Sequence, residues 1–442
     1  MARPKTIPFR ETLRKLFPAA LLLTLARETG AVLRRRKVDI VCLFWTVILG
    51  SGRGRGRTLT GMRCEYEKVT RQTLSSSAFQ KRFTAGFVRF LKRAVSVAFG
   101  QVKGLNRPLE GPLAAFHDVL LTDGTVIRLH DLLEKSFPGS RTNHSKAALK
   151  YHPVMSIRGE GEQSVRITSG RRNDGPVLKI GRWVKDRLLI FDLAYFRYHL
   201  FACITRNKGF FLSRLKSSAN PTIVGENRPH RGRGASLVGQ CLRDVLGTLT
   251  GQILDVRVKV AFSRRLYKGG TRRDRQTLRV VGLHDEATGE YHLYMTNVPP
   301  DKLAAEDVGP VYACRWLVEQ MFRRLKSHYR LEDMPSRKKE TVEALVYCAI
   351  LTMLVADELL HAVRLKLAVV DERLKRMRWA ALFERFAGEL LLIVTQPRRA
   401  VRFLERMIAH MVVAEAPDPN LQRAGLLRAV EKRTYKYRSN SL

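Results

Sequence analysis

The chain has 442 residues, of which 80 are Lys or Arg and 40 are Asp or Glu, so its formal net charge at pH 7 is +40. Because 45% of the residues are hydrophobic, the chain can bury a core and is not a disordered basic tail; the excess positive charge indicates a polyanionic partner, first of all nucleic acid. The two longest apolar runs have about 13 residues, short of the roughly 20 that span a bilayer, so we expect core helices and no membrane partner.

Cysteine and histidine patterns restrict the function further. The six cysteines include no CxxC pair, and no HExxH pattern is present, so neither a disulfide framework nor a zinc site is expected. The first 26 residues are basic and then apolar, but they contain Glu11 and lack a small-residue cleavage site. These features favour a reducing compartment and argue against secretion.

Residues 1–110 are predicted to form a helical DNA-binding domain. Helical periodicity is present at 10–17, at 38–50 and at 75–100, where a run of serines can N-cap the helix. Between the last two lies the glycine-rich segment 50–61, with Arg53, Arg55 and Arg57. It is either a DNA-contacting loop or a solvated basic linker, and the sequence leaves both open.

Residues 111–216 are predicted to form the first part of an α/β core. Short β-branched or apolar runs indicate strands, and a crossover helix is expected before a buried strand at 188–191, which ends in Asp192 and leads into a helix at 193–207. The other expected elements are strands at 119–129, 148–157 and 164–170 and the crossover helix at 175–188.

The rest of the chain divides into three segments. Residues 217–300 are predicted to be a β-rich insertion, with strands at 253–262, 276–285 and 290–298. The first two strands are joined by the basic segment SRRLYKGGTRRDR, which could lie on a phosphate backbone. Residues 301–415 are predicted to be helical, at 301–332 and 340–413, and to complete the core; 416–442 form a basic tail.

One predicted helix carries an unusual stripe of side chains. At 100° per residue, Tyr312, Arg315, Glu319 and Lys326 share an arc of about 60°. The alternative interpretation is a solvated face on which Arg315 and Glu319 form an i, i+4 pair worth a few tenths of a kcal/mol.

Three carboxylates stand out in this basic chain. Asp123 lies in a predicted strand, Asp192 ends the next buried strand, and Glu319 lies on the cationic helix. Together such groups could hold two Mg²⁺ or Mn²⁺ ions for phosphodiester displacement. The alternative is that Asp123 is a turn residue before Gly124 and that Asp192 is a helix N-cap.

The spacing Y-x2-R-x3-E-x6-K at Tyr312, Arg315, Glu319 and Lys326 resembles the signature of the DDE transposases of the insertion sequence four family. The segment DLAYF resembles that family's second-aspartate motif, with Ala194 where relatives often have glycine, and FFLSRLK resembles the following strand, which points to Arg214 as a DNA contact. Two further features add to the match: the Arg-Trp pair before the glutamate and the Phe-x-x-Leu-Lys residues after it, which include Arg323. The resemblance covers roughly 115–335.

The resemblance implies an α/β protein with a ribonuclease H-like catalytic core and a mainly β insertion, flanked by a helical N-terminal domain and C-terminal helices. It implies a metal-dependent transposase in which Asp123, Asp192 and Glu319 hold two Mg²⁺ or Mn²⁺ ions. It also implies contacts with double-stranded DNA, both the terminal repeats and the target, from Tyr312, Arg315, Lys326, Arg214 and Arg323. A homodimer is expected in the DNA complex, because the reaction brings two ends together. The expected location is the prokaryotic cytoplasm, at the nucleoid.

Three questions stay open at this stage. A hairpin intermediate would need an aromatic side chain in the insertion to hold a flipped base, for which Tyr267, Tyr291 and Tyr294 are candidates. The main alternative function is an inactive, transposase-derived DNA-binding protein. A ribonuclease H-like nuclease acting on RNA or junctions ranks third.

Overall fold

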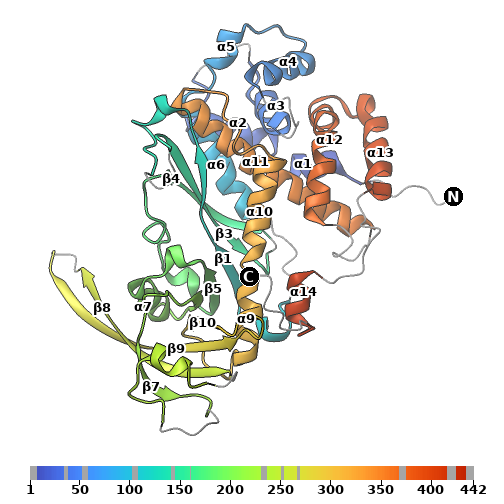
Figure 1. Cartoon of the computed structure of the whole chain (residues 1–442). Coiled ribbons are helices and arrows are strands. Elements are labelled where there is room, and N and C mark those ends of the chain that lie inside the picture. Colours follow the sequence, from blue (N-terminus) through green and yellow to red (C-terminus); the bar gives the residue numbers. More distant parts are fainter. Residues whose placement is uncertain are drawn as a thin grey trace.

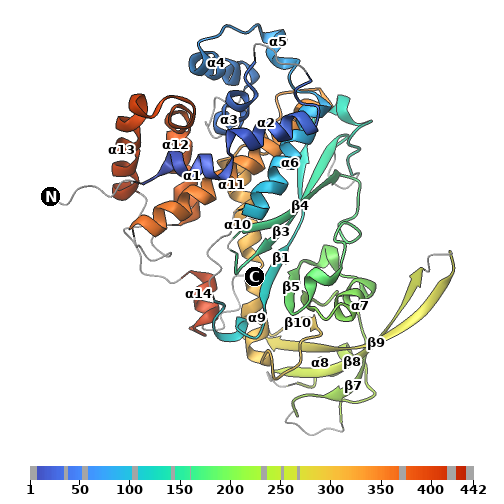
Figure 2. The ribbon, with the colours of Figure 1, turned by 180° about the vertical axis from the view of Figure 1, so that it is seen from behind.

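The computed structural model describes residues 7–33, 38–51, 58–101, 108–140, 145–159, 161–229, 236–249, 253–265, 269–367, 375–415 and 425–434. A mixed sheet runs through the molecule, with the helices of residues 9–101 and 339–415 gathered at one end and a long two-stranded ribbon projecting from the other (Figures 1 and 2). The mixed α/β architecture predicted from the sequence is confirmed.

The sheet has ten strands in the order β2-β3-β1-β5-β6-β10-β9-β8-β7, and β4 pairs with β3. Only the neighbours β1, β5 and β6 are parallel, and the other pairings are antiparallel. The strands are β1 (Asp118–Thr122), β2 (Thr125–Arg128), β3 (Ala148–Ser156), β4 (Gly161–Ser169), β5 (Arg187–Phe191), β6 (Phe210–Arg214), β7 (Thr222–Glu226), β8 (Leu254–Arg265), β9 (Thr271–His284) and β10 (Tyr291–Thr296). The strands of the predicted insertion therefore continue the core sheet, because β10 pairs with β6.

Two predicted elements between 175 and 275 are wrong. The expected crossover helix at 175–188 contains only the 3-10 turn η5 (Arg182–Val184), since Gly175, Pro176 and Gly181 interrupt the segment. The basic segment 263–275 is largely strand: β8 reaches Arg265 and β9 begins at Thr271.

The N-terminal helices are α1 (Phe9–Leu16), α2 (Ala19–Glu28), α3 (Ile40–Ser51), α4 (Leu59–Thr70), α5 (Ser76–Gln80) and α6 (Ala85–Gln101). The helix predicted at 75–100 is thus two helices, of which the first is N-capped by Ser75, whose hydroxyl accepts from the Ala78 N–H. Arg53, Arg55 and Arg57 lie outside the described residues.

The C-terminal helices are α9 (Ala305–Ala313), α10 (Trp316–Ser327), α11 (Lys339–Leu367), α12 (Arg376–Thr395), α13 (Arg398–Glu415) and α14 (Leu426–Glu431), so part of the predicted tail is helical. By length and apolar composition α11 could cross a membrane, but 78% of its most apolar window is buried inside the protein. It lies at the centre of the helical end, where the Thr352 hydroxyl donates to the Ile48 carbonyl of α3. Both apolar runs are therefore core helices, as predicted.

The two faces of the sheet belong to different cores. Val119 and Leu121 of β1, with Leu188 and Ile190 of β5, pack in the core formed with the helices. The alternate residues Leu120, Leu189 and Phe191 pack in a second core with α7 (Tyr198–Arg206). Because successive side chains alternate across a strand, residues 123 and 192, which continue β1 and β5, are directed toward the helical face.

Candidate active site

Asp123 and Asp192 emerge side by side from the sheet. Each directly follows its strand, β1 or β5, and the last residues of these parallel strands, Thr122 and Phe191, are opposite each other in the register. Arg214 ends the next parallel strand, β6, in which Leu212 is opposite Ile190. Carboxyl ends of parallel strands are where open α/β sheets collect functional groups, and here two acids and a cation meet at that edge.

Helix α10 covers this edge and brings Glu319 to it. Its apolar residues Val318, Phe322 and Leu325 pack in the same core as β1, which fixes the helix on the sheet. Arg315, immediately before α10, places Nη1 3.2 Å from Oδ2 of Asp123 and Nη2 2.7 Å from Oε1 of Glu319. One guanidinium thus contacts two carboxylates that are far apart in the sequence, so both lie within its span.

The signature residues do not share one uninterrupted helix. Tyr312 is on α9, and the backbone N–H groups of Cys314, Arg315, Leu317 and Val318 donate to carbonyls three residues earlier, which separates α9 from α10. The predicted continuous helix over 301–332 is therefore wrong at this point. Arg315 lies at the junction, where a change in a few backbone angles would move it relative to Glu319.

Burial and charge act strongly on Asp123. Its side chain is 17% exposed. The pKa of Asp123 is raised from 3.8 to about 6, chiefly by burial; the negative charges of Asp192 and Glu319 contribute to the rise, while the Gly124 N–H and Arg315 oppose it. The folded protein therefore disfavours the ionised form of Asp123, and an added cation would stabilise that form.

The raised pKa of Asp123 predicts that Asp123→Asn stabilises the metal-free protein. Because the folded-state pKa lies above the unfolded value, the cost of ionising Asp123 is absent below pH 3.8, grows up to about pH 6 and is complete above it. We expect the free energy of unfolding at pH 8 to rise by about 1–3 kcal/mol, with the gain disappearing toward pH 3.8. Urea unfolding measures it, with Asp131→Asn, at a 62% exposed carboxylate, as control; an equal gain in both variants, or none at pH 8, would contradict it.

Tyr312 lies in the same cluster but is buried. Its pKa is raised to about 12, chiefly by burial; Arg315 and Arg214 oppose the rise and Asp192 contributes to it, so Tyr312 lies in the electrostatic field of these three groups. The Arg315 guanidinium lies over the Tyr312 ring, 6.0 Å from its centroid. Tyr312 is thus a neutral phenol that supports Arg315 in this conformation.

The remaining predicted DNA contacts lie further along α10. Nζ of Lys326 is 2.7 Å from Oε1 of Glu332 and makes no ion pair with the three candidate carboxylates. Arg323 is exposed, whereas its neighbour Arg324 is buried and places Nη1 2.6 Å from Oδ1 of Asp357 on α11. The adjacent arginines therefore differ: Arg324 anchors the helix, and Arg323 faces outward.

The residues present suit a hard divalent cation. Three carboxylates supply oxygen ligands of the kind that Mg²⁺ and Mn²⁺ prefer, and the charges of Asp192 and Glu319 both act on Asp123. Within the described residues, no three His, Cys, Asp or Glu side chains are arranged to hold a metal ion as they stand. In this conformation Arg315 lies between two of the acids, so metal binding requires that its guanidinium withdraw.

Trp316 is a residue that the sequence reasoning missed. It directly follows Arg315 and is 40% exposed, so it presents a large aromatic surface at the start of α10. The Arg-Trp pair was the available signal. Of the tyrosines considered for holding a flipped base, Tyr294 is fully buried, the Tyr291 hydroxyl donates to the Leu249 carbonyl, and Tyr267 lies outside the described residues.

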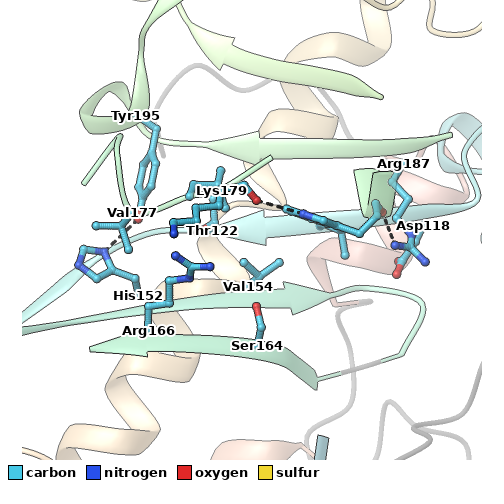
Figure 3. A pocket seen from close by; sticks show the side chains of 13 residues that line it. Asp118, Thr122, His152, Val154, Ser164, Arg166, Val177, Lys179, Arg187 and Tyr195 are labelled. Carbon is cyan, nitrogen blue, oxygen red and sulfur yellow. Dashed lines mark hydrogen bonds between the residues drawn. The ribbon is translucent and has the colours of Figure 1, made fainter. Parts of the chain in front are cut away.

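A cavity of about 350 Å³ lies on the opposite face of the sheet, and none of the three candidate carboxylates lines it. Figure 3 shows Thr122, His152, Arg166 and Tyr195 in its wall, with the His152 ring directed toward the Tyr195 hydroxyl. Burial lowers the pKa of His152 to about 4, so this histidine is neutral at pH 7. We therefore assign it to packing behind the site.

Comparison with known proteins identifies the family. The family described as "Transposase DDE domain" matches residues 114–355, more than half of the chain. The chain is 23% identical over 396 residues to the transposase for insertion sequence element IS231F of Bacillus thuringiensis subsp. israelensis, covering 81% of this chain and 80% of that protein. It is 21% identical over 345 residues to the transposase for insertion sequence element IS1151 of Clostridium perfringens, covering 71% and 72%. A shorter match, 29% over 88 residues and 20% of this chain, is to a putative transposase for insertion sequence element IS186A of Escherichia coli (strain K12). The chain therefore belongs to the transposase DDE domain family and is a metal-dependent enzyme of DNA transposition.

Proposed function

We propose that the protein binds the terminal inverted repeats of an insertion sequence and moves it by cut-and-paste transposition, with Asp123, Asp192 and Glu319 holding two Mg²⁺ or Mn²⁺ ions. The observation that carries this proposal is the convergence of the acids. Asp123 and Asp192 follow opposed residues of neighbouring parallel strands, and Arg315 links Asp123 to Glu319.

The side chains have distinct tasks in this chemistry. The bound ions would activate the attacking oxygen, first of water and then of the freed 3′-end, and stabilise the leaving oxygen. The two aspartates are positioned by strands and Glu319 by a docked helix, so the ligands are held on rigid elements. Arg315 neutralises the acids before DNA binds, and on release its guanidinium can pair with a phosphate of the incoming strand.

Other cations extend the contact with DNA. Arg214 lies at the same edge as the acids, and Arg323 and Lys326 lie along α10. We assign these three residues to the phosphate backbone beside the cleaved end, and Tyr312, which the sequence also suggested as a DNA contact but which is buried, to the support of Arg315. The helices within 1–110 are assigned to recognition of the terminal repeat, and residues 217–300 to an insertion that lengthens the sheet.

Assembly and location follow from the reaction. Cut-and-paste transposition joins two ends, so we assign a homodimer in the DNA complex. We place the protein in the prokaryotic cytoplasm at the nucleoid, where its substrate lies.

Metal-dependent nicking tests the proposal. The wild-type protein is incubated with duplexes that carry the element's own terminal repeats, and with duplexes in which the repeats are scrambled, with Mg²⁺, with Mn²⁺ or with a chelator. Cuts at the ends of the repeats that need the metal are expected. Binding without any cutting under all metal conditions would instead support an inactive DNA-binding protein.

Lys326→Ala is expected to weaken strand transfer and to flatten its dependence on salt. If Lys326 leaves Glu332 to contact one phosphate, its loss lowers the slope of log K against log salt by about 0.9 for duplex DNA. Binding titrations over a salt series measure this slope. Lys146→Ala is the control, because Lys146 is also paired with a carboxylate, Asp131; equal slopes for wild type and Lys326→Ala would refute the assignment.

A further inference from the structure

The strands β8 and β9 form a ribbon that leaves the body of the protein. β7 pairs with β8 only as far as Lys259, and β10 pairs with β9 only as far as Arg279. Beyond these residues β8 and β9 pair only with each other, up to Arg265 and Thr271. Figures 1 and 2 show this ribbon extending away from the sheet. Two strands alone are marginally stable in water, so an extension of this kind indicates a task outside the fold.

The ribbon has two unlike faces. On the inner face, near the body of the protein, the side chains are buried or half-buried: Val258, Val260 and Phe262 alternate along β8, and Gln276 and Leu278 lie on the same face of β9. Phe262 packs against Tyr198 of α7, with ring centroids 6.3 Å apart, and Nε2 of Gln276 donates to the Thr205 hydroxyl at 3.1 Å.

The outer face carries free positive charge. Arg257 and Lys259 of β8 and Arg273 and Arg275 of β9 are all exposed, and none forms an ion pair with another described residue. On the inner face, by contrast, Arg264 and Arg272 both pair with Asp274, at 3.4 and 3.3 Å. The acidic residue of this segment thus neutralises one face and leaves the other unneutralised.

We propose that Arg273 and Arg275 on the outer face of the β8–β9 ribbon, with Arg257 and Lys259 on the same face at its base, bind the phosphate backbone of duplex DNA away from the candidate carboxylates. A two-stranded ribbon fits the major groove of B-DNA, and the arginine guanidinium forms bidentate hydrogen bonds with phosphate. This proposal rests on DNA as the partner and adds a second point of contact to the site at β1, β5 and α10.

The position of the ribbon supports a contact with DNA over one with a protein. Its outer face combines cations with small polar or short side chains, Ala261, Ser263 and Thr277, and exposes no large apolar group among the described residues. Protein interfaces have an apolar centre, whereas DNA interfaces are polar and positively charged. Exposed arginines that have no acidic partner within the described part of the chain match a phosphate backbone.

Paired substitutions on the two faces test the proposal. Arg273→Gln with Arg275→Gln removes two charges from the outer face, and Arg264→Gln with Arg272→Gln removes two from the inner face at the same level of the ribbon. Binding is measured without metal, over a salt series, to a duplex with one terminal repeat and to an unrelated duplex of equal length. The outer-face variant is expected to bind on the order of tenfold more weakly at low salt. Its slope of log K against log salt should be shallower by about 1.8, which is 0.9 for each phosphate contact.

The two duplexes distinguish the source of the phosphates. Loss on the terminal-repeat duplex alone assigns the ribbon to the element's end, and equal loss on both assigns it to duplex DNA in general, as in target capture. Arg273→Lys with Arg275→Lys should restore the slope, and circular dichroism verifies that each variant is folded. Unchanged slopes on both duplexes, or the same loss in the inner-face variant, would overturn the proposal.

Nicking activity is a separate readout from this binding. A wild-type protein that nicks its ends, with an outer-face variant that binds like wild type, would refute the ribbon contact and leave the catalytic assignment intact. A protein that never nicks, but whose outer-face variant loses the predicted slope, would refute the catalytic assignment alone.

Discussion

Glu319→Gln is expected to lower the rate of metal-dependent nicking at the terminal repeats by on the order of 10³-fold or more, the loss usual for a group that acts with others as a catalytic unit. The substitution keeps the size of the side chain and removes the charge that would bind metal. Binding of the repeat should persist, because Glu319 is an acid and donates nothing to the phosphates. Nicking and binding are measured on the same duplex.

Protein stability does not account for this expected loss. The Glu319 side chain is 42% exposed, and its partner in the structure is Arg315, so its removal should change the free energy of unfolding by less than about 1 kcal/mol. Glu332→Gln is the matched control, because Glu332 is a similarly exposed acid, at 49%, paired with Lys326 near the end of the same helix. The assignment fails if Glu319→Gln cuts at the wild-type rate, or if Glu332→Gln loses as much.

Glu319→Gln also tests the role of Arg315 in the metal-free protein. With Glu319 neutral, Arg315 keeps its contact with Asp123 and loses the one with Glu319. A divalent ion then displaces Arg315 more easily, but it finds one carboxylate ligand fewer. We expect the lost ligand to have the larger effect if the three acids share the metals. Calorimetry should then show weaker Mn²⁺ binding to the free variant, together with the loss of nicking.

The end of one core strand could be predicted from the sequence: the apolar run 188–191 is β5, and Asp192 directly follows it. The strand predicted at 119–129 is wrong, because Asp123 and Gly124 separate β1 from β2, so Asp123 follows a strand and does not lie within one. The position of Glu319 next to these acids could not be derived from the sequence pattern alone. The contact between Arg315 and Asp123 spans 192 residues of sequence and depends on how α10 docks.

Other features were hidden by competing signals. In the segment 263–275 the repeated arginines resemble a solvated loop. In the structure Arg264 is opposite Arg272 across the ribbon, and both contact Asp274 on the same face. These contacts are compatible with two paired strands. Neither Cys314 nor Arg315 marks the junction of α9 and α10 by composition. The crossover at 175–188 has apolar residues at helical spacing, but Pro176 and two glycines prevent a helix.

Arg279→Met is expected to destabilise the protein by about 3–5 kcal/mol, because it leaves Asp255 as a buried charge without its partner. Arg279 of β9 lies diagonally across from Asp255 of β8, because the register pairs Asp255 with Val281. The two side chains are 4% and 5% exposed, and Nη2 of Arg279 is 2.6 Å from Oδ2 of Asp255. Nη1 of Arg279 also donates to the carbonyls of Val298, at 3.1 Å, and Leu303, at 2.7 Å. Both carbonyls lose these bonds in the variant.

This ion pair connects the sheet to α9, which precedes the helix that carries Glu319. Val298 and Leu303 lie in the segment that leads from β10 into α9, and α9 is followed by Arg315 and α10. Urea unfolding measures the loss, with Arg273→Met on the exposed part of the same strand as control. Loss of nicking by Arg279→Met should follow the unfolded fraction and recover where the variant is folded, whereas Glu319→Gln stays inactive when fully folded. If Arg279→Met unfolds at the same urea concentration as Arg273→Met, the pair does not hold the sheet to α9, and the position of Arg315 depends on the packing of α10 alone.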